Sequence, residues 1–534
     1  MSRSARPSGI AFVLLTTVAL PVFASEQTPV KWAPYLDLEG KPGSKRNLGE
    51  ADLFLPLTQS SASMLFADLR GRWGSDGGQE GNFGLGARRM LDSGWNIGGY
   101  GFFDRRRSDH GNYFNQITLG IEALSQDWDL RANGYLPVGT YSYTVDSLNT
   151  ATLSGTSIIF RNGLEQSMGG FDGEIGWRVP LFGAAAQRQL RIYAGGYRFA
   201  RDGMPTVQGP RGRVDLTFDE VPGLWRGSRL SLGLEVQHDA PRGTQTFGLL
   251  RLRIPLERLP GGERPTLSPM ERRMTDPVVR DVDVVTQAGS YGAPEIVTQT
   301  ASGQNITVVD SNSTSTTSAL QAALNTAGAG TVILSGTFNT NAAIQMSAGQ
   351  TIIGRGSLSV RSPSGHTATL TTPGATISAA TDSTLSALIM NNGTTLDGVT
   401  VANTYSLGSS NSVTAQGYSG VTIKNSTISA GGSNGSYAID AASSTNMVVS
   451  GNSISATSSG GSSGIGIRAI GANNITIADN TFDMAGALQY VIAGSNTTVF
   501  NTAASIGNVT NSGNCFFVSP PTGSVGFTGG MTCP

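Results

Sequence analysis

Several stretches before residue 260 alternate strictly between apolar and polar side chains, with charged residues on the polar side. The segment "RLSLGLEVQ" sets Leu230, Leu232, Leu234 and Val236 against Ser231, Gly233, Glu235 and Gln237. "ITLGIEA" (117–123) and "MLFADLRGR" (64–72) show the same period. A period of two residues is typical of β-strands that have two different surroundings. Gly- and Asp-rich stretches such as 74–82 and 107–112 separate these strands as turns.

The polar side of these strands decides which kind of β-protein they form. It carries Asp68, Arg70, Arg72, Glu122, Glu235, Arg251 and Arg253. A soluble β-fold would turn its apolar side inward, whereas a membrane barrel turns it toward lipid and keeps a polar lumen. About a dozen strand candidates lie between residues 51 and 256, an even number that suits an outer-membrane barrel. We therefore predict a transmembrane antiparallel β-barrel.

The N-terminus has the pattern of a secretory signal. Arg3 and Arg6 precede the apolar run 11–20, and small residues lead to Ser25. The alternative, a membrane-anchoring helix, needs about 18–20 apolar residues, more than this run offers. We predict a signal peptide at 1–24, a short periplasmic segment at 25–49, and a barrel at 50–258 in the outer membrane of a Gram-negative bacterium.

Four segments resemble the barrel of the intimin/invasin family of inverse autotransporters. They are "NFGLGARRML" (82–91), "WNIGGYGFFDRRR" (95–107), "LGIEALSQDWDLRANGYLPVG" (119–139) and "LRIYAGGYRF" (190–199). The signature residues are Phe102, Phe103 and Asp104, which the family has at a strand end, and Asn133, Gly134 and Tyr135. The resemblance spans about residues 50–285. It implies twelve strands, followed by a segment that returns through the pore to carry a passenger outside.

The segment 259–305 fits that returning role. "SPMERRMTDPVVRDVDVVTQ" (268–287) holds Arg272, Arg273 and Arg280 among Asp276, Asp281 and Asp283. Both signs of charge suit a chain inside a charged lumen, although a solvated linker would also be polar. The sequence departs from other family members in two ways. Residues 25–49 are too few for a peptidoglycan-binding module, and the passenger after residue 305 does not resemble a chain of immunoglobulin-like domains.

A second chemistry begins near residue 306. Residues 306–534 contain six Asp, no Glu, three Arg and one Lys. Four segments repeat an apolar pair five residues apart: Leu396/Val401, Ile423/Ile428, Val449/Ile454 and Ile477/Phe482. The offsets between repeats are 27, 26 and 28 residues, which is typical of a parallel β-helix. A helix at 317–328 before a strand at 331–338 resembles the start of pectate-lyase-like right-handed β-helices.

Two features of this repeat region have structural interpretations. Asn425, Asn452 and Asn480 fall in the turn between the paired strands, where asparagine tolerates a left-handed backbone. Stacked asparagines could also share hydrogen bonds between coils. Cys515 and Cys533 are the cysteines of the chain, and export favours a disulfide between them over a metal or catalytic role.

An enzymatic passenger is the main alternative. Polysaccharide lyases and hydrolases of β-helix fold need clustered carboxylates, but Asp310, Asp382, Asp397, Asp440, Asp479 and Asp483 are scattered through the repeats. His366 lies in a loop, and His110 and His238 lie near barrel turns without a serine nucleophile motif. We predict no catalytic residue, no metal site and no cofactor. The alternative is a surface-displayed polysaccharide lyase or hydrolase.

The sequence thus predicts an all-β protein: a twelve-stranded transmembrane antiparallel barrel followed by a right-handed parallel β-helix. The function we expect is display of an extracellular passenger for adhesion or biofilm formation. Expected partners are outer-membrane lipid, barrel-assembly machinery and periplasmic chaperones. The passenger would bind a host or bacterial surface ligand, such as a glycan, or another copy of itself. The net charge of −1 gives no attraction to nucleic acid.

Overall fold

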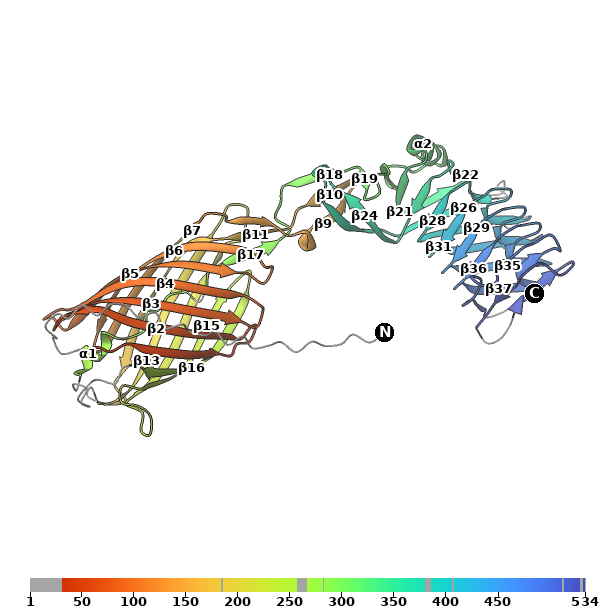
Figure 1. The fold of residues 1–534 in the computed structure, drawn as a ribbon. Coiled ribbons are helices and arrows are strands. Elements are labelled where there is room, and N and C mark those ends of the chain that lie inside the picture. The colour runs from red at the N-terminus through yellow and green to blue at the C-terminus, as the bar shows by residue number, and fades with distance from the viewer. Residues whose placement is uncertain are drawn as a thin grey trace. The chain divides into compact units, whose positions relative to one another are not determined.

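The fold is that of a computed structural model, which describes residues 31–183, 186–256, 267–281, 283–379, 386–405, 408–510, 513–528 and 532–533. The chain divides into two compact units (Figure 1). One comprises residues 1–141 and 166–287, and the other comprises residues 142–165 and 288–534. The predicted signal peptide, 1–24, lies outside the described residues.

Twelve antiparallel strands among the described residues close the first unit into a barrel (Figure 1). They are β1 (Tyr35–Lys41), β2 (Leu48–Gln59), β3 (Ser63–Gly74), β4 (Gln79–Met90), β5 (Trp95–Arg107), β6 (Tyr113–Ser125), β7 (Trp128–Val138), β12 (Gly169–Val179), β13 (Arg188–Ala200), β14 (Val207–Asp219), β15 (Arg229–Asp239) and β16 (Gly243–Pro255). Strand β1 pairs with β2 on one side and β16 on the other, which leaves no free edge.

The barrel begins earlier than expected. Strand β1 lies within the segment 25–49 that the sequence pattern assigns to the periplasm, so a start at residue 50 is wrong. The strand has only seven residues, and its alternation is correspondingly brief. Leu38 is exposed on the outer side, while Asp37 is buried on the inner side. Without this strand β2 and β16 would each keep an unpaired edge.

The two faces of the barrel have opposite chemistry, as the alternation predicts. Leu119 and Ile121 on β6 are 65% and 67% exposed, whereas Asp104 on β5 and Asp129 on β7 are fully buried. Apolar side chains therefore point outward and charged ones point into the lumen, which is the arrangement of a membrane-spanning barrel. Inward glycines make room for rings, because a Cβ at Gly84 would overlap the ring of Phe102.

The second unit contains a parallel β-solenoid, whose described residues make about 8 turns. Its strands are β20 (Ile306–Asp310), β21 (Thr331–Thr340), β22 (Ile344–Gln345), β23 (Thr351–Ile353), β26 (Ala375–Ala379), β27 (Ser386–Ile389), β28 (Thr395–Asp397), β29 (Val399–Thr404), β30 (Ser410–Thr414), β31 (Thr422–Lys424), β32 (Thr427–Gly432), β33 (Ser436–Asp440), β34 (Val448–Ser450), β35 (Ser453–Arg468), β36 (Thr476–Ala478), β37 (Thr481–Gly494), β38 (Val509–Thr510) and β39 (Asn514–Phe517).

The register of the solenoid confirms the repeat. Leu396, Ile423, Val449 and Ile477 pair in one parallel column, and Val401, Ile428, Ile454 and Phe482 pair in the next. All eight side chains are fully buried. Each coil therefore contributes its five-residue apolar step to one continuous core.

The expected helix is also present. Helix α2 (Thr317–Ala327) begins after Thr316, whose side chain accepts a hydrogen bond from the backbone N–H of Ala319. Leu320 and Leu324 are buried in the solenoid core. No helix in the described ranges is long and apolar enough to cross a membrane.

The second unit also contains a stretch that the sequence pattern assigns to the barrel. Residues 142–165 hold β8 (Ser142–Thr144), β9 (Thr150–Ser154) and β10 (Ser157–Arg161), and β11 (Leu164–Ser167) follows. Strands β9 and β10 join β18 (Pro294–Val297), β25 (Thr367–Thr372), β24 (Gly356–Arg361) and β19 (Gln299–Thr300) in a mixed sheet. The predicted barrel of residues 50–258 is thus wrong for this insertion. Its alternating period resembles that of the barrel strands, so the two could not be told apart. The predicted linker of residues 259–305 is likewise wrong from residue 288 onward, because β18 and β19 belong to the second unit.

Candidate functional site in the barrel lumen

A short helix starts the segment that fills the lumen. Helix α1 (Pro269–Arg273) begins with a capping box, in which the Ser268 hydroxyl accepts from the N–H of Glu271. The Glu271 carboxylate accepts in return from the N–H of Ser268, at 2.7 Å. We call residues 268–281 and 283–285 the threading segment.

The barrel wall binds the backbone of the threading segment from several sides. Trp32, Tyr35, Arg88, Asn96 and Arg253 donate hydrogen bonds to carbonyls of residues 270–276, at 2.6–3.0 Å. These donors come from the residues before β1 and from β1, β4, β5 and β16. A chain that touches both β5 and β16 in a closed barrel must lie within it. The structure therefore places the threading segment in the lumen, as its charge pattern predicts.

Each charged side chain from Arg273 to Asp283 has an opposite charge beside it. The pairs are Arg273–Asp129 at 2.5 Å, Asp276–Arg229 at 2.7 Å, Arg280–Asp104 at 3.0 Å, Asp281–Arg211 at 3.0 Å and Asp283–Arg46 at 2.7 Å. The partners lie on β7, β15, β5, β14 and the β1–β2 connection. A buried charge is tolerated when it is paired in this way, so wall and segment are matched electrostatically.

The first signature lies in the middle of β5 rather than at its end. Phe102 and Asp104 point into the lumen, and Phe103, 42% exposed, points outward. Strand β5 continues to Arg107, so the expected strand end after Asp104 is wrong. Arg106 is also inward and pairs with Asp283. Because the charge of Arg106 is paired inside the lumen, the strand can continue past Asp104 to Arg107.

Asp104 forms the centre of a buried polar cluster. Its carboxylate accepts hydrogen bonds from Asn82, at 2.8 Å, and from Thr118, at 2.5 Å. Arg280 completes the cluster and lies 4.7 Å above the ring of Phe102. Asp104 is thus a partner of a threading arginine, as expected of an acid in a charged lumen.

The second signature also contacts the threading segment. Asn133 accepts a hydrogen bond from the Tyr100 hydroxyl at 2.8 Å, and donates to the carbonyl of Val279 at 3.2 Å. The Tyr135 hydroxyl accepts from the N–H of Asp281 at 2.6 Å. Gly134 has open space where a Cβ would stand, so it makes no such contact. Phe102, Asp104, Asn133 and Tyr135 therefore converge on one stretch, residues 279–281.

The predicted asparagines of the solenoid do not form one column. Asn425 has the left-handed backbone, with φ of 52°, and its equivalents in other coils are Gly398, Gly451, Asp479 and Gly507. Asn452 and Asn480 are one position further along and fully inside. Treating the three as equivalent is wrong, because Lys424 pairs with Ser450 and not with Gly451.

Asn452, Asn480 and Asn508 form a buried asparagine ladder. The Asn452 side chain donates to Asn480 at 2.9 Å, and Asn480 donates to Asn508 at 3.1 Å. Each amide also donates to a carbonyl of the preceding coil: Ile423, Val449 and Ile477 respectively. The side-chain oxygens of Asn480 and Asn508 accept from the backbone N–H of Asn452 and Asn480. The predicted sharing of hydrogen bonds between coils is therefore present, but with Asn508 in place of Asn425.

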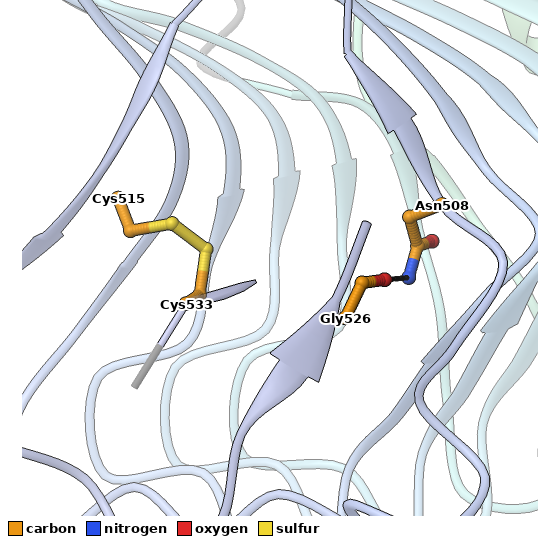
Figure 2. Close-up of a disulfide and its surroundings, with 4 residues drawn as sticks. All are labelled: Asn508, Cys515, Gly526 and Cys533. Atoms are coloured by element: carbon orange, nitrogen blue, oxygen red, sulfur yellow. Dashed lines mark hydrogen bonds between the residues drawn. A yellow bond between two sulfur atoms is a disulfide. The ribbon is translucent and has the colours of Figure 1, made fainter. Parts of the chain in front are cut away.

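The cysteines are joined. Cys515 on β39 and Cys533 on β41 (Thr532–Cys533) form a disulfide, with Cα atoms 5.6 Å apart (Figure 2). Strand β41 pairs with β40 (Val525–Gly526). Figure 2 also shows Asn508, the last described member of the asparagine ladder, donating to the carbonyl of Gly526 at 3.1 Å. The last coil is thus held at two points.

The acidic residues of the solenoid are dispersed. Asp397 pairs with Lys424 at 3.1 Å, and Asp440 pairs with Arg468 at 3.0 Å. His366 contacts Asp146, also at 3.0 Å. Asp382 lies outside the described residues. Within the described part of the chain, no group of three or more His, Cys, Asp or Glu is placed to hold a metal ion.

Comparison with known proteins gives one family match, which lies in the barrel unit. Residues 33–199 match the family described as inverse autotransporter, beta-domain. That range contains both signatures and the strands β1 to β7. No curated protein sequence matches the chain.

Solved structures of several membrane proteins are similar to part of the chain. A membrane protein from work on in-meso crystallization is 16% identical, with a TM-score of 0.34, and covers 48% of this chain and 99% of its own. The NanC porin is 11% identical, with a TM-score of 0.25 and coverage of 42% and 100%. The outer membrane phospholipase dimer of Salmonella typhi is 12% identical, with a TM-score of 0.26 and coverage of 43% and 94%. With TM-scores this low, nothing further about this chain follows from them.

Several residues of the lumen and the solenoid could not be singled out from the sequence. Arg88, Arg211 and Arg229 bind the threading segment, but alternation shows only that they face inward. Asn508 could have been found, since it follows Asn480 by the repeat length of 28 residues. The insertion 142–165 carries no signal of its own that separates it from a barrel hairpin.

Proposed function

We propose that this protein is an inverse autotransporter that displays its solenoid at the cell surface for adhesion or biofilm formation. The observation that carries the proposal is the charge-matched threading segment, which connects a membrane-type barrel to a passenger of a different chemistry. A porin would need an open lumen, whereas this lumen is occupied by a chain that continues into the passenger. Assembly would require outer-membrane lipid, barrel-assembly machinery and periplasmic chaperones.

A mixed aromatic and charged patch supports a binding role for the solenoid. It consists of Tyr437, Asp440, Arg468, Tyr490 and Phe516, from β33, β35, β37 and β39. The Arg468 guanidinium lies over the ring of Tyr437 and binds both oxygens of Asp440. The rings of Tyr490 and Phe516 lie 4.9 Å apart, and Phe516 is 44% exposed. Tyr490 stands two coils after Tyr437 in one parallel column, and Phe516 stands two coils after Arg468 in another. Together they offer the apolar ring faces and polar donors that suit sugar rings.

Protease added to intact cells tests surface display. We expect loss of the solenoid while the barrel remains whole, because loops and linkers outside the membrane are open to cleavage. Full protection of the passenger in intact cells, with cleavage after lysis, would overturn the proposal.

Binding of cells to an array of surface glycans tests the patch. We expect Y490A/F516A to weaken binding or cell aggregation, while I506A leaves it unchanged. Ile506 is an exposed apolar side chain outside the patch, so it controls for loss of apolar surface. Release of unsaturated or reducing ends from any polysaccharide would favour the lyase or hydrolase alternative instead.

A further inference from the structure

An insertion in the barrel chain carries a hairpin that belongs to the passenger unit. Strands β7 and β12 are neighbours in the barrel wall, yet the chain between them runs from residue 139 to residue 168. Within it, β9 and β10 form an antiparallel hairpin, with Ala151 opposite Phe160 and Leu153 opposite Ile158. Gly155 in the turn has a φ of 59°, which suits a two-residue hairpin turn.

The hairpin lies in the middle of a sheet otherwise made of passenger strands. Strand β10 pairs with β18, so that Ile158 opposes Val297 and Ile159 opposes Ile296. Strand β9 is bridged to β25 at Ala151 and Leu370, and β25 continues the sheet to β24 and β19. Removing the hairpin would separate β18 from β25 and expose the edges of both. We call the six strands the junction sheet.

The hairpin also completes a hydrophobic core with the first coil of the solenoid. Ile158 and Phe160 are 1% and 0% exposed. They share one cluster with Val297, Val360, Leu370 and Ile333. Ile333 belongs to β21, whose neighbours Val332 and Leu334 point the other way, into the solenoid core. The first part of strand β21, residues 331–334, is therefore buried on both faces, and the junction sheet covers its outer one.

The column of paired residues that contains Ile333 changes in character along the solenoid. From Ile333 the column of paired residues continues, coil by coil, through Ile353, Asp397, Lys424, Ser450 and Ala478. Isoleucine occurs in the first two coils, where both side chains are buried. Charged, polar or small residues occupy the later coils, where the column is partly accessible. The residue of the first coil, Ile333, thus matches the apolar cover that the hairpin and its neighbours provide.

Polar contacts fix the register of the hairpin against the passenger. The Asn149 side chain donates to the carbonyl of Thr367 at 3.1 Å and accepts from the N–H of Gly163 at 2.8 Å. Arg161 donates to the carbonyl of Gly292 at 3.1 Å. Asp146 lies 3.0 Å from His366. Contacts therefore flank the hairpin on both sides.

We propose that the β9–β10 hairpin is an intramolecular folding template for the passenger. A single coil of a solenoid cannot bury its own apolar face, so the first coil needs a surface on which to form. The hairpin precedes the passenger in the chain and carries strand edges that β18 and β25 occupy. Once these strands are paired, β21 has a covered outer face, and later coils add to it one at a time. The proposal does not depend on surface display.

Cross-linking tests the pairing directly. In the full-length chain refolded in detergent, I159C/I296C places two thiols on directly opposed residues, within the range of a disulfide. The control T152C/I296C moves one thiol a strand further away, because Thr152 opposes Ile159 on the other side. At about 9–10 Å the control pair is too distant to close. We expect mass spectrometry to find the bridge in the first variant alone, before the passenger becomes protease-resistant. A bridge in neither variant, or one that forms only after resistance, would overturn the template.

Folding rates test the consequence. We expect F160D to leave the heat-modifiable mobility of the barrel intact while passenger resistance appears about tenfold more slowly. T152D, on the exposed side of the same hairpin, should fold at the rate of the unmodified chain. Folding of F160D at that rate would overturn the proposal. Loss of the barrel as well would also overturn it, because the hairpin would then serve barrel assembly instead.

Discussion

Arg280 and Asp104 face each other inside the barrel, with 3.0 Å between a guanidinium nitrogen and a carboxylate oxygen. Both side chains are almost completely shielded from solvent. Asp104 belongs to the wall, and Arg280 belongs to the segment that passes through it. The pair therefore ties the contents of the pore to strand β5, and Glu80 lies close to the same arginine at 3.9 Å.

Replacing Arg280 should loosen the threading segment. R280A leaves Asp104 and Glu80 buried without this cation, and breaking a buried pair in this way costs about 3–5 kcal/mol. We expect a lower temperature for the heat-induced mobility shift of the barrel and a larger ion conductance in planar bilayers. R105A is the matched control, because Arg105 follows Asp104 on β5 but points out of the barrel, 5.0 Å from the ring of Tyr113. Equal shift temperatures and equal conductances in the two variants would show that Arg280 does not hold the threading segment in the lumen.

The asparagine ladder should be the most sensitive polar feature of the solenoid. N480A leaves the N–H of Asn452 and the carbonyl of Val449 without their partners inside the core. Each orphaned buried group costs about 1–3 kcal/mol, so we expect the passenger to lose about 2 kcal/mol or more. The measurement is the denaturant midpoint for protease resistance of the passenger.

Asn425 provides the control for the ladder. N425G should change stability little, because glycine already occupies the equivalent left-handed position in three other coils. It removes one exposed hydrogen bond, to Asp397 at 2.8 Å. If N425G were as harmful as N480A, the turn itself rather than the buried ladder would control stability.

The architecture could be predicted because its signals are periodic. Period-two alternation distinguishes Ile121, which is exposed to the membrane side, from Glu122, which is buried in the lumen. The repeat length likewise fixes which residues stack, as Val449 on Ile477 shows. In both cases one local rule is repeated many times, so errors at single positions do not matter.

Features that depend on a single long-range contact could not be predicted. Nothing local shows that Phe160 packs near Ile333, since both look like ordinary strand residues. Arg280 could be assigned to the lumen by its charge, but its partner depends on the depth to which the chain threads. The offset between Asn425 and Asn452 shows the same limit, because a shift of one residue exchanges a surface turn for a core position.

The disulfide should stabilise the last coil alone. C515S/C533S opens a loop of 18 residues, for which the chain-entropy estimate is about 3 kcal/mol. Solenoid coils contact only their neighbours, so hydrogen exchange should rise in 513–528 and remain slow around Asn452. Addition of reductant to the unmodified protein should reproduce the effect. Faster exchange throughout the passenger would show that the disulfide controls the whole solenoid.

Acid should loosen the contact between Glu295 of β18 and the loop at Ser364. Hydrogen bonds from the Ser364 hydroxyl and N–H, at 2.8 and 3.0 Å, hold the pKa of the Glu295 carboxyl below its usual value. A lowered pKa means that the stabilisation is complete above the unfolded value of about 4.3. It is lost as the pH falls through the lower folded value. The effect should be small, since the carboxylate is accessible to solvent.

Hydrogen exchange of residues 362–366 between pH 6 and pH 3, corrected for intrinsic rates, measures this contact. We expect protection to fall toward pH 3 in the unmodified chain and to be low and independent of pH in E295Q. His366 and Asp146 are the other titratable pair beside this loop, so H366N separates their contribution. A pH response that persists in E295Q but disappears in H366N would assign the acid sensitivity to the histidine instead.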